Sequence, residues 1–165
     1  MSVLRRSGAL GGAFVAALGL AIIPATSASA DFPRFERFEN KASGKCLEVA
    51  DWSTANNAVV RQWACTEGAN QKWDLVAGSY VNRHSGKCLE VADWSTARGA
   101  VLRQWDCTSG SNQKWEAFSC DSRFACFYAN VNSGHVMEIG GYSTSNGARA
   151  VQWPYNRGDN QRWYP

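Results

Sequence analysis

The chain has 165 residues, with 17 basic against 14 acidic side chains and a formal net charge of +3. No cluster of Lys and Arg stands out, so the sequence lacks the electrostatic footprint of a nucleic-acid-binding protein, and binding to an anionic membrane has equally little support. The length beyond the N-terminal segment suits one domain with a full core, and no apolar run of membrane-spanning length follows that segment.

Residues 1–30 show the parts of an export signal. Arg5 and Arg6 form a positive start, an apolar stretch covers 9–23, and small residues at 28–30 supply a cleavage site. A membrane anchor is the weaker alternative, because the apolar stretch is short and broken by glycines. We therefore predict a cleaved signal peptide and a secreted protein. An arginine pair alone does not identify the export route.

One block of sequence occurs twice almost unchanged and a third time with many substitutions. Ser43–Trp73 and Ser85–Trp115 are identical at 25 of 31 positions, and Ser133–Trp163 keeps the SG, ST, QW and NQRW segments. Such a period indicates a repeat architecture, in which each copy buries its apolar face against its neighbours. The expected repeats span about 36–78, 79–119 and 126–165 of a single domain, 31–165.

Each copy contains about four short stretches of strand character between clusters of Gly, Ser, Asn and Asp. In the first copy these are 37–40, 46–50, 59–64 and 72–76. No part of the chain after the leader shows sustained helical periodicity, so we predict an all-β protein. Three units of about four strands match the twelve strands of a β-trefoil with pseudo-threefold symmetry, which is the fold we expect.

All six cysteines follow the predicted leader, and in an exported chain this indicates disulfides. Cysteines 19 residues apart occur in both of the first two copies, so the repeat itself selects the pairing and leaves one pair at an unrepeated insertion. The predicted bonds are Cys46–Cys65, Cys88–Cys107 and Cys120–Cys126. A metal site is the alternative, but His84 and His135 lack ligand spacing to the cysteines. We expect no metal and no cofactor.

Strand alternation places three kinds of side chain on one face of each central hairpin. In the first copy Leu47 and Val49 point to the core, whereas Glu48 shares the opposite face with Arg61 and Trp63. A carboxylate, a guanidinium and an indole should therefore lie side by side. The second copy repeats this set as Glu90, Arg103 and Trp105. The third keeps Glu138 and Trp153 but has Val151 in place of the arginine.

Each copy ends in Asn-Gln-x-Trp. The tryptophan can bury a large apolar area, so Trp73, Trp115 and Trp163 are predicted to belong to the core. A second repeated pair, Asp51-Trp52 and Asp93-Trp94, leaves two readings open. Its tryptophans either stack on a ligand or pack locally.

These Asn-Gln-x-Trp motifs, the CLEV segments and the paired cysteines resemble the ricin-B-type lectin family of β-trefoils. The resemblance implies up to one sugar site per repeat, with a carboxylate and an Asn binding hydroxyls, an aromatic ring stacking on the sugar, and a Gln supporting the turn. It suggests galactose- or xylose-containing glycans. Arg61 and Arg103 stand where the family prefers Gln, and simple pairing with the neighbouring Glu is the alternative to a binding role. The candidate sugar-binding residues are Glu48, Arg61, Trp63, Asn70, Gln71, Glu90, Arg103, Trp105, Asn112, Gln113, Glu138, Trp153, Asn160 and Gln161.

We interpret the chain as a secreted, monomeric, non-catalytic lectin that is weak at each site and multivalent. Glycoside hydrolysis needs two nearby carboxyls of different pKa, whereas these acids recur one per repeat in similar surroundings. Binding at the third repeat, which lacks both the disulfide and the arginine, is expected to be altered or lost.

The alternative is a β-trefoil protein-binding module, such as a protease inhibitor or an adaptor. It would use an unrepeated surface, namely Phe32–Phe38, the 120–126 loop or the third repeat.

Overall fold

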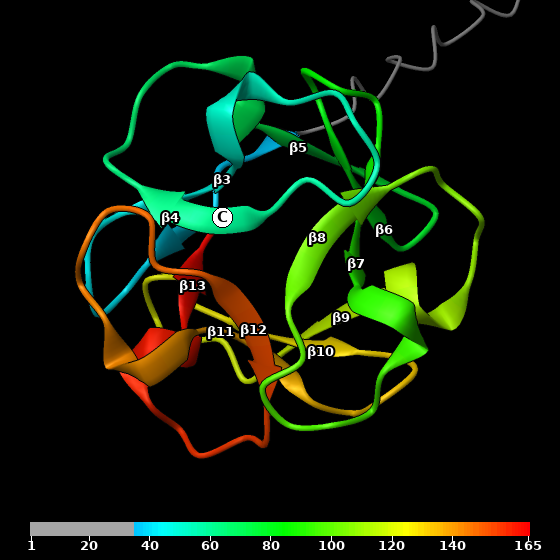
Figure 1. The fold of residues 1–165 in the computed structure, drawn as a ribbon. Helices are drawn as coiled ribbons and strands as arrows, with labels where there is room; N and C mark the ends of the chain where they lie inside the picture. Colours follow the sequence, from blue (N-terminus) through cyan, green and yellow to red (C-terminus); the bar gives the residue numbers. More distant parts are fainter. Residues whose placement is uncertain (1–34) are drawn as a thin grey trace, which may run out of the picture. The chain divides into compact units, whose positions relative to one another are not determined.

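The computed structural model describes residues 35–165, so the predicted signal peptide at 1–30 lies outside the described residues. The described part consists of short β-strands and single-turn 3₁₀ helices, with no α-helix in that range (Figure 1). Between 35 and 165 no helix is long and apolar enough to cross a membrane. The strands are β1 (Phe35–Glu36), β2 (Glu39–Asn40), β3 (Cys46–Val49), β4 (Val60–Trp63), β5 (Trp73–Val76), β6 (Ser79–Asn82), β7 (Cys88–Val91), β8 (Leu102–Trp105), β9 (Trp115–Phe118), β10 (Phe127–Asn130), β11 (Val136–Ile139), β12 (Ala150–Trp153) and β13 (Trp163–Tyr164). The 3₁₀ turns are η1 (Ala50–Trp52), η2 (Ala69–Gln71), η3 (Ala92–Trp94), η4 (Ser111–Gln113), η5 (Gly140–Tyr142) and η6 (Asp159–Gln161).

The strands form three antiparallel sheets. Their orders are β13-β2-β3-β4, β1-β5-β6-β7-β8 and β12-β11-β10-β9. Each sheet therefore joins the last strand of one repeat to the first three strands of the next, and β13 closes the ring by pairing with β2. The three units surround a common centre (Figure 1). This arrangement confirms the predicted β-trefoil, to which β1 adds a strand that the repeat pattern does not contain.

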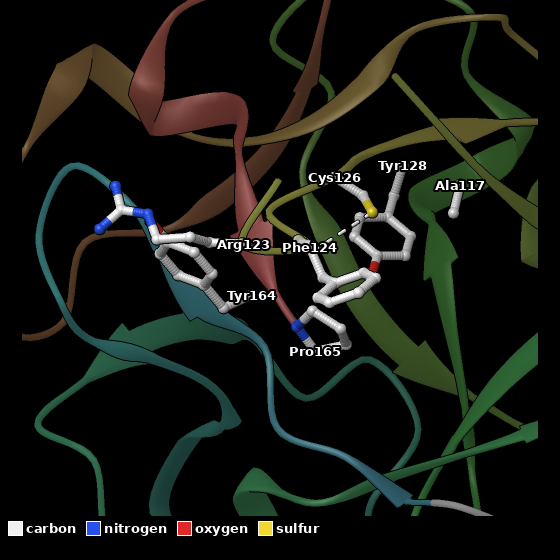
Figure 2. Close-up of a pocket in the computed structure, with 7 residues that line it drawn as sticks. All are labelled: Ala117, Arg123, Phe124, Cys126, Tyr128, Tyr164 and Pro165. Carbon is white, nitrogen blue, oxygen red and sulfur yellow. Dashed lines mark hydrogen bonds between the residues drawn. The ribbon is translucent and has the colours of Figure 1, made fainter. Parts of the chain in front are cut away.

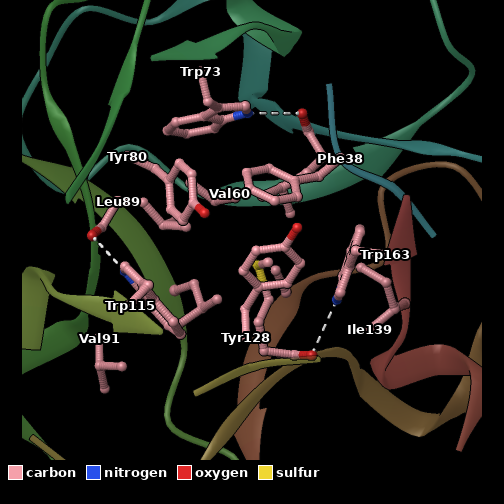
Figure 3. Packing of buried hydrophobic residues seen from close by; sticks show 14 of the residues in the cluster. Phe38, Val60, Trp73, Tyr80, Leu89, Val91, Trp115, Tyr128, Ile139 and Trp163 are labelled. Carbon is pink, nitrogen blue, oxygen red and sulfur yellow. Dashed lines mark hydrogen bonds between the residues drawn. The ribbon is translucent and has the colours of Figure 1, made fainter. Parts of the chain in front are cut away.

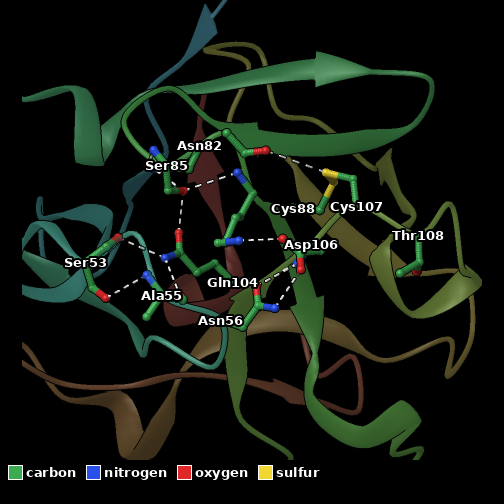
Figure 4. Close-up of polar contacts among 12 residues, drawn as sticks. Ser53, Ala55, Asn56, Asn82, Ser85, Cys88, Gln104, Asp106, Cys107 and Thr108 are labelled. Atoms are coloured by element: carbon green, nitrogen blue, oxygen red, sulfur yellow. Dashed lines mark hydrogen bonds and ion pairs between the residues drawn. A yellow bond between two sulfur atoms is a disulfide. The ribbon is translucent and has the colours of Figure 1, made fainter.

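Strands β4, β8 and β12 meet in the middle of the fold and hold the repeats in a ring. Each carries a fully buried glutamine, at positions 62, 104 and 152. Gln104 Nε2 donates to the carbonyls of Ser53 and Ala55 in the preceding repeat, each at 2.9 Å (Figure 4). Gln62 and Gln152 bind the equivalent carbonyls of the loops at 143–145 and 95–97. The third repeat thus binds the first, the first binds the second, and the second binds the third.

The core lies between the three sheets. In its middle Phe38, Tyr80 and Tyr128 pack edge to face, with ring centroids 4.7 to 5.9 Å apart (Figure 3). The tryptophans of the three Asn-Gln-x-Trp motifs surround them, and each indole N–H donates to a backbone carbonyl. These are Trp73, Trp115 and Trp163, all buried, which confirms their predicted place in the core.

The three predicted disulfides are present, and no free cysteine remains among residues 35–165. The bond between Cys120 and Cys126 closes the insertion between β9 and β10. In the third repeat Tyr155 stands at one of the cysteine positions. Its ring packs against Phe127, with the centroids 4.7 Å apart. Aromatic packing therefore occurs where the other repeats have a covalent bond.

Candidate functional site

The hairpin of β3 and β4 positions the first set of polar side chains. Its register places Glu48 opposite Arg61 and Cys46 opposite Trp63. Arg61 Nε donates to Glu48 Oε1 at 2.9 Å, and the guanidinium carbon lies 4.5 Å from the centre of the Trp63 ring. The carboxylate, guanidinium and indole predicted from strand alternation are therefore side by side, and Leu47 and Val49 are buried in the core as predicted.

The turn η2 completes the surroundings of Glu48. Gln71 Nε2 and Asn70 Nδ2 donate to Glu48 Oε2 at 3.0 and 3.3 Å. Gln71 Oε1 accepts from the Thr66 N–H at 2.7 Å, so this glutamine supports the turn as predicted. Glu48 is only 4% exposed, because the turn covers a face that strand alternation alone leaves open. Its three donors compensate for the burial of an ionised carboxylate.

The amide of Asn70 binds groups inside the site rather than groups at its surface. Its Nδ2 also donates to the Val49 carbonyl at 3.2 Å, and its Oδ1 is buried without a hydrogen-bond partner. A side chain added at Gly68 would come within 2.6 Å of that Oδ1. The asparagine therefore orients the carboxylate, and only the edge of its amide borders the space outside.

The loop after β3 brings in two further side chains. Asp51 and Trp52 both have φ of 54°, in the left-handed region. Aspartate tolerates this conformation, but tryptophan rarely adopts it, and such outliers cluster at functional sites. Asp51 Oδ1 accepts from Arg61 Nη2 at 3.0 Å, and Trp52 is 52% exposed. Trp52 therefore fits both interpretations: it is exposed beside the site, and its ring also packs edge to face against His84, with the centroids 4.9 Å apart, and against Gly68.

Together these elements enclose a pocket of about 250 Å³. It is lined by Glu48, Asp51, Trp52, Arg61, Trp63, Thr66 and Asn70. Asp51, Trp52 and Thr66 were not among the candidate sugar-binding residues. All three recur in the second repeat, as Asp93, Trp94 and Thr108, and this recurrence is the signal that points to them.

The second repeat reproduces the arrangement. Arg103 Nε donates to Glu90 Oε1 at 2.8 Å and Nη1 donates to Asn57 Oδ1 at 3.0 Å, while the guanidinium carbon lies 4.4 Å from the Trp105 ring centre. Asn112 and Gln113 donate to Glu90 Oε2 at 3.3 and 2.9 Å. Asn57 belongs to the first repeat, so the border of this site comes from its neighbour.

The third repeat differs in the partners of its carboxylate. Gln161 Nε2 donates to Glu138 Oε2 at 2.9 Å, but Val151 stands opposite Glu138 and offers no hydrogen bond. Burial raises the pKa of Glu138, while hydrogen bonds from Gln161 and Asn160 act in the opposite direction. The pocket here measures about 380 Å³. It is lined by Gly99, Glu138, Gly140, Gly141, Tyr142, Val151, Trp153, Asn156 and Asn160.

The structure thus gathers all fourteen candidate residues into three sets, one in each repeat. Each set belongs to a β-trefoil hairpin and presents an aromatic ring beside a carboxylate held by amides. The three repeats therefore carry three related candidate binding sites.

The family model for the ricin-type β-trefoil lectin domain matches residues 34–163. The chain therefore belongs to this family of carbohydrate-binding modules, and the resemblance predicted from the motifs is confirmed. Among curated protein sequences, none matches the chain significantly.

Solved structures share the fold. ThreeFoil, a designed threefold-symmetric protein, is 36% identical with a TM-score of 0.74, over 78% of this chain and 95% of its own. An exo-β-1,3-galactanase from Clostridium thermocellum is 33% identical with a TM-score of 0.76, over 81% of this chain but only 30% of its own length. The C-half of an earthworm R-type lectin, solved with GalNAc, is 17% identical with a TM-score of 0.65, over 80% of this chain and 97% of its own, and supports the fold alone.

Proposed function

We propose that the chain is a secreted, non-catalytic carbohydrate-binding module that acts as a monomer and engages uncharged glycans at more than one repeat. The observation that carries this proposal is the recurrence of an indole beside an amide-held carboxylate in all three hairpins. A pyranose has a C–H-rich face that packs on an indole and a rim of hydroxyls that suits carboxylates and amides. Each pocket offers these groups together.

The charges of the sites favour a neutral ligand. In the first pocket the carboxylates of Glu48 and Asp51 outnumber the single guanidinium of Arg61. In the third pocket Glu138 is the one ionisable carboxyl among the lining residues, and no basic side chain lines it. A uronic acid or sulfated sugar would bring a like charge to these carboxylates, which opposes binding.

The carboxylates are arranged for binding rather than for hydrolysis. A glycosidase needs an acid and a base or nucleophile flanking the scissile bond. In the first site Arg61 lies between Glu48 and Asp51 and binds both, so the space between the two carboxylates is already filled. In the third pocket Glu138 has no second carboxylate among the lining residues. This supports a module without catalytic activity.

Each site is expected to be weak, with a Kd near millimolar, since a small open pocket leaves much of a sugar in water. Several sites on one rigid fold gain affinity when they bind one polysaccharide together. A long glycan should therefore bind far better than its monosaccharide.

The ligand can be found by pull-down with plant, fungal and bacterial polysaccharides, with galactose and xylose as competitors. Galactan is included because the galactanase at 33% identity acts on that polymer. Trp63→Ala and Trp105→Ala should each reduce retention modestly, and the double variant should reduce it further, because each removes an indole on which a sugar can stack once it displaces the neighbouring guanidinium.

The matched control is Phe124→Ala, which removes an aromatic ring that is 71% exposed and outside the three repeated sites. It should bind like the parent protein. Unchanged retention in a folded Trp63→Ala/Trp105→Ala variant would contradict the assignment of these sites.

One observation favours the alternative of a protein-binding module. The insertion with its disulfide and the last residues of the chain enclose an unrepeated pocket of about 410 Å³ (Figure 2). It is lined by Ala117, Arg123, Phe124, Cys126, Tyr128, Tyr164 and Pro165. If the parent retains no glycan but captures one protein, and Phe124→Ala abolishes that capture, this alternative replaces the lectin proposal.

A further inference from the structure

One hairpin position separates the three sites into two kinds. The residue opposite the glutamate is Arg61 in the first repeat, Arg103 in the second and Val151 in the third. The position lies between the carboxylate and the indole, so its side chain determines what reaches either group.

In the first two repeats the arginine occupies both recognition groups. Arg61 donates to Glu48 at 2.9 Å and to Asp51 at 3.0 Å, and its guanidinium carbon lies 4.5 Å from the centre of the Trp63 ring. A sugar ring stacking on that indole would compete with the guanidinium, and its hydroxyls would compete for the same carboxylate. The side chains of Arg61 and Arg103 are mostly buried, at 19% and 13% exposed, so neither is a loose surface residue.

In the third repeat no arginine of the same hairpin binds the carboxylate or covers the indole. Val151 leaves Glu138 with amide donors alone, and Gly141 replaces the aspartate that binds the arginine in the other repeats. The pocket is larger, about 380 Å³ against 250 Å³ in the first repeat. The guanidinium carbon of Arg98 lies 5.8 Å from the Trp153 ring centre, farther than the 4.5 and 4.4 Å of the arginines in the other repeats.

A buried carboxylate that lacks a strong donor can gain a hydrogen bond from a ligand. Desolvation penalises its ionised form, and burial raises the pKa of Glu138 for that reason. A sugar hydroxyl that donates to it would supply part of what arginine supplies elsewhere. Trp153 and Tyr142 border the same space and can pack on the sugar ring.

We propose that the third repeat is the principal glycan site of this chain and that it takes an uncharged pyranose. The side chain opposite the glutamate, which is Arg61, Arg103 or Val151, determines which repeat binds the sugar. The inference rests on the proposed function. It reverses the expectation from the sequence that binding is altered or lost in the third repeat.

The test replaces Val151, which stands opposite Glu138. Retardation in native gels is measured with β-1,3-galactan and with arabinoxylan for the parent, Val151→Arg and the matched control Val131→Arg, which adds the same side chain at a 48% exposed valine outside the pocket. Val151→Arg places the arginine of the other repeats opposite Glu138 and should weaken binding about tenfold, as should Trp153→Ala, whereas Val131→Arg should stay within about twofold. Circular dichroism and thermal unfolding establish that each variant is folded.

Two results would overturn the proposal, and they are distinct. If Val151→Arg and Trp153→Ala bind like the parent while Trp63→Ala/Trp105→Ala loses binding, the glycan function stands but the third repeat is not its principal site. If the parent is retarded by neither polysaccharide and retains none in the pull-down screen, the proposed function fails and this inference fails with it.

Discussion

Glu48 and Glu138 occupy the same position in their repeats but have different donors. Glu48 receives hydrogen bonds from a guanidinium and two amides, whereas Glu138 depends on the amides of Gln161 and Asn160. A charge that is buried without a cationic partner costs stability. The third site therefore combines a carboxylate that lacks a cationic partner with a local loss of stability.

This difference predicts a pH effect. Because burial raises the pKa of Glu138, the folded protein holds a proton that the unfolded chain releases from about pH 4.5 upward. The contribution of this residue to the free energy of unfolding is therefore full below that pH and declines as pH rises through the raised pKa. Glu138→Gln should abolish the decline, so urea unfolding should show the variant gaining stability over the parent at pH 7 relative to pH 4.

The control for that experiment is Glu116→Gln, which changes an exposed glutamate on β9. Its stability relative to the parent should change little between the two pH values. An equal change for both variants would show that Glu138 is not the group responsible.

For individual residues, strand alternation in the sequence was enough to predict that Glu48, Arg61 and Trp63 lie together, because neighbours on one face of a hairpin depend only on the register of its strands. It did not reveal that the guanidinium covers the indole, since that depends on side-chain rotamers. Nor did it show that Asp51 joins the bridge, since this requires a left-handed loop that has no strand periodicity.

The elements that hold the sites are short hairpins joined by 3₁₀ turns, and buried glutamines bind each hairpin to the loop of another repeat. Gln104 binds the carbonyls of Ser53 and Ala55, some 50 residues away in sequence. The same loop carries Asn57, which contacts Arg103. A glutamine in the middle of one hairpin thus also fixes the border of a site.

Replacing this glutamine should destabilise the fold. Gln104→Leu keeps the size of the side chain but removes the donor to the Ser53 and Ala55 carbonyls and an acceptor of the Ser85 hydroxyl, so we expect a loss of about 2 kcal/mol in the free energy of unfolding. Denaturant titration measures it, with Glu116→Leu as the control at an exposed strand position. A loss no larger than that of the control would mean that the glutamine does not hold the repeats together.

The strands themselves were largely predictable, because short apolar stretches between Gly, Asn and Asp clusters mark them. The role of Gln62 was not predictable, because its partners Ser143 and Ser145 lie more than 80 positions away. Sequence periodicity carries no information on such distant pairs.

Residues 35–165 form a ring of three units, and the sites of the second and third repeats are each bordered by a residue of the preceding repeat. The threefold fold and the disulfide pairing followed from the repeat, because near-identical blocks must build near-identical units. The added strand β1 did not, since two residues, Phe35 and Glu36, are too few to show a pattern. The asymmetry among the sites is likewise a structural finding, although its source, Val151 in place of arginine, is visible in the sequence.

The ring places its sites on one rigid fold, which is the basis for multivalent binding. The central claim is that glycans are bound at these repeated pockets. The most direct test is titration calorimetry with the polysaccharide identified by pull-down, comparing the parent with Trp63→Ala/Trp105→Ala/Trp153→Ala. We expect binding by the parent and none by the folded triple variant. Equal binding by the two proteins would contradict glycan binding at the repeated pockets.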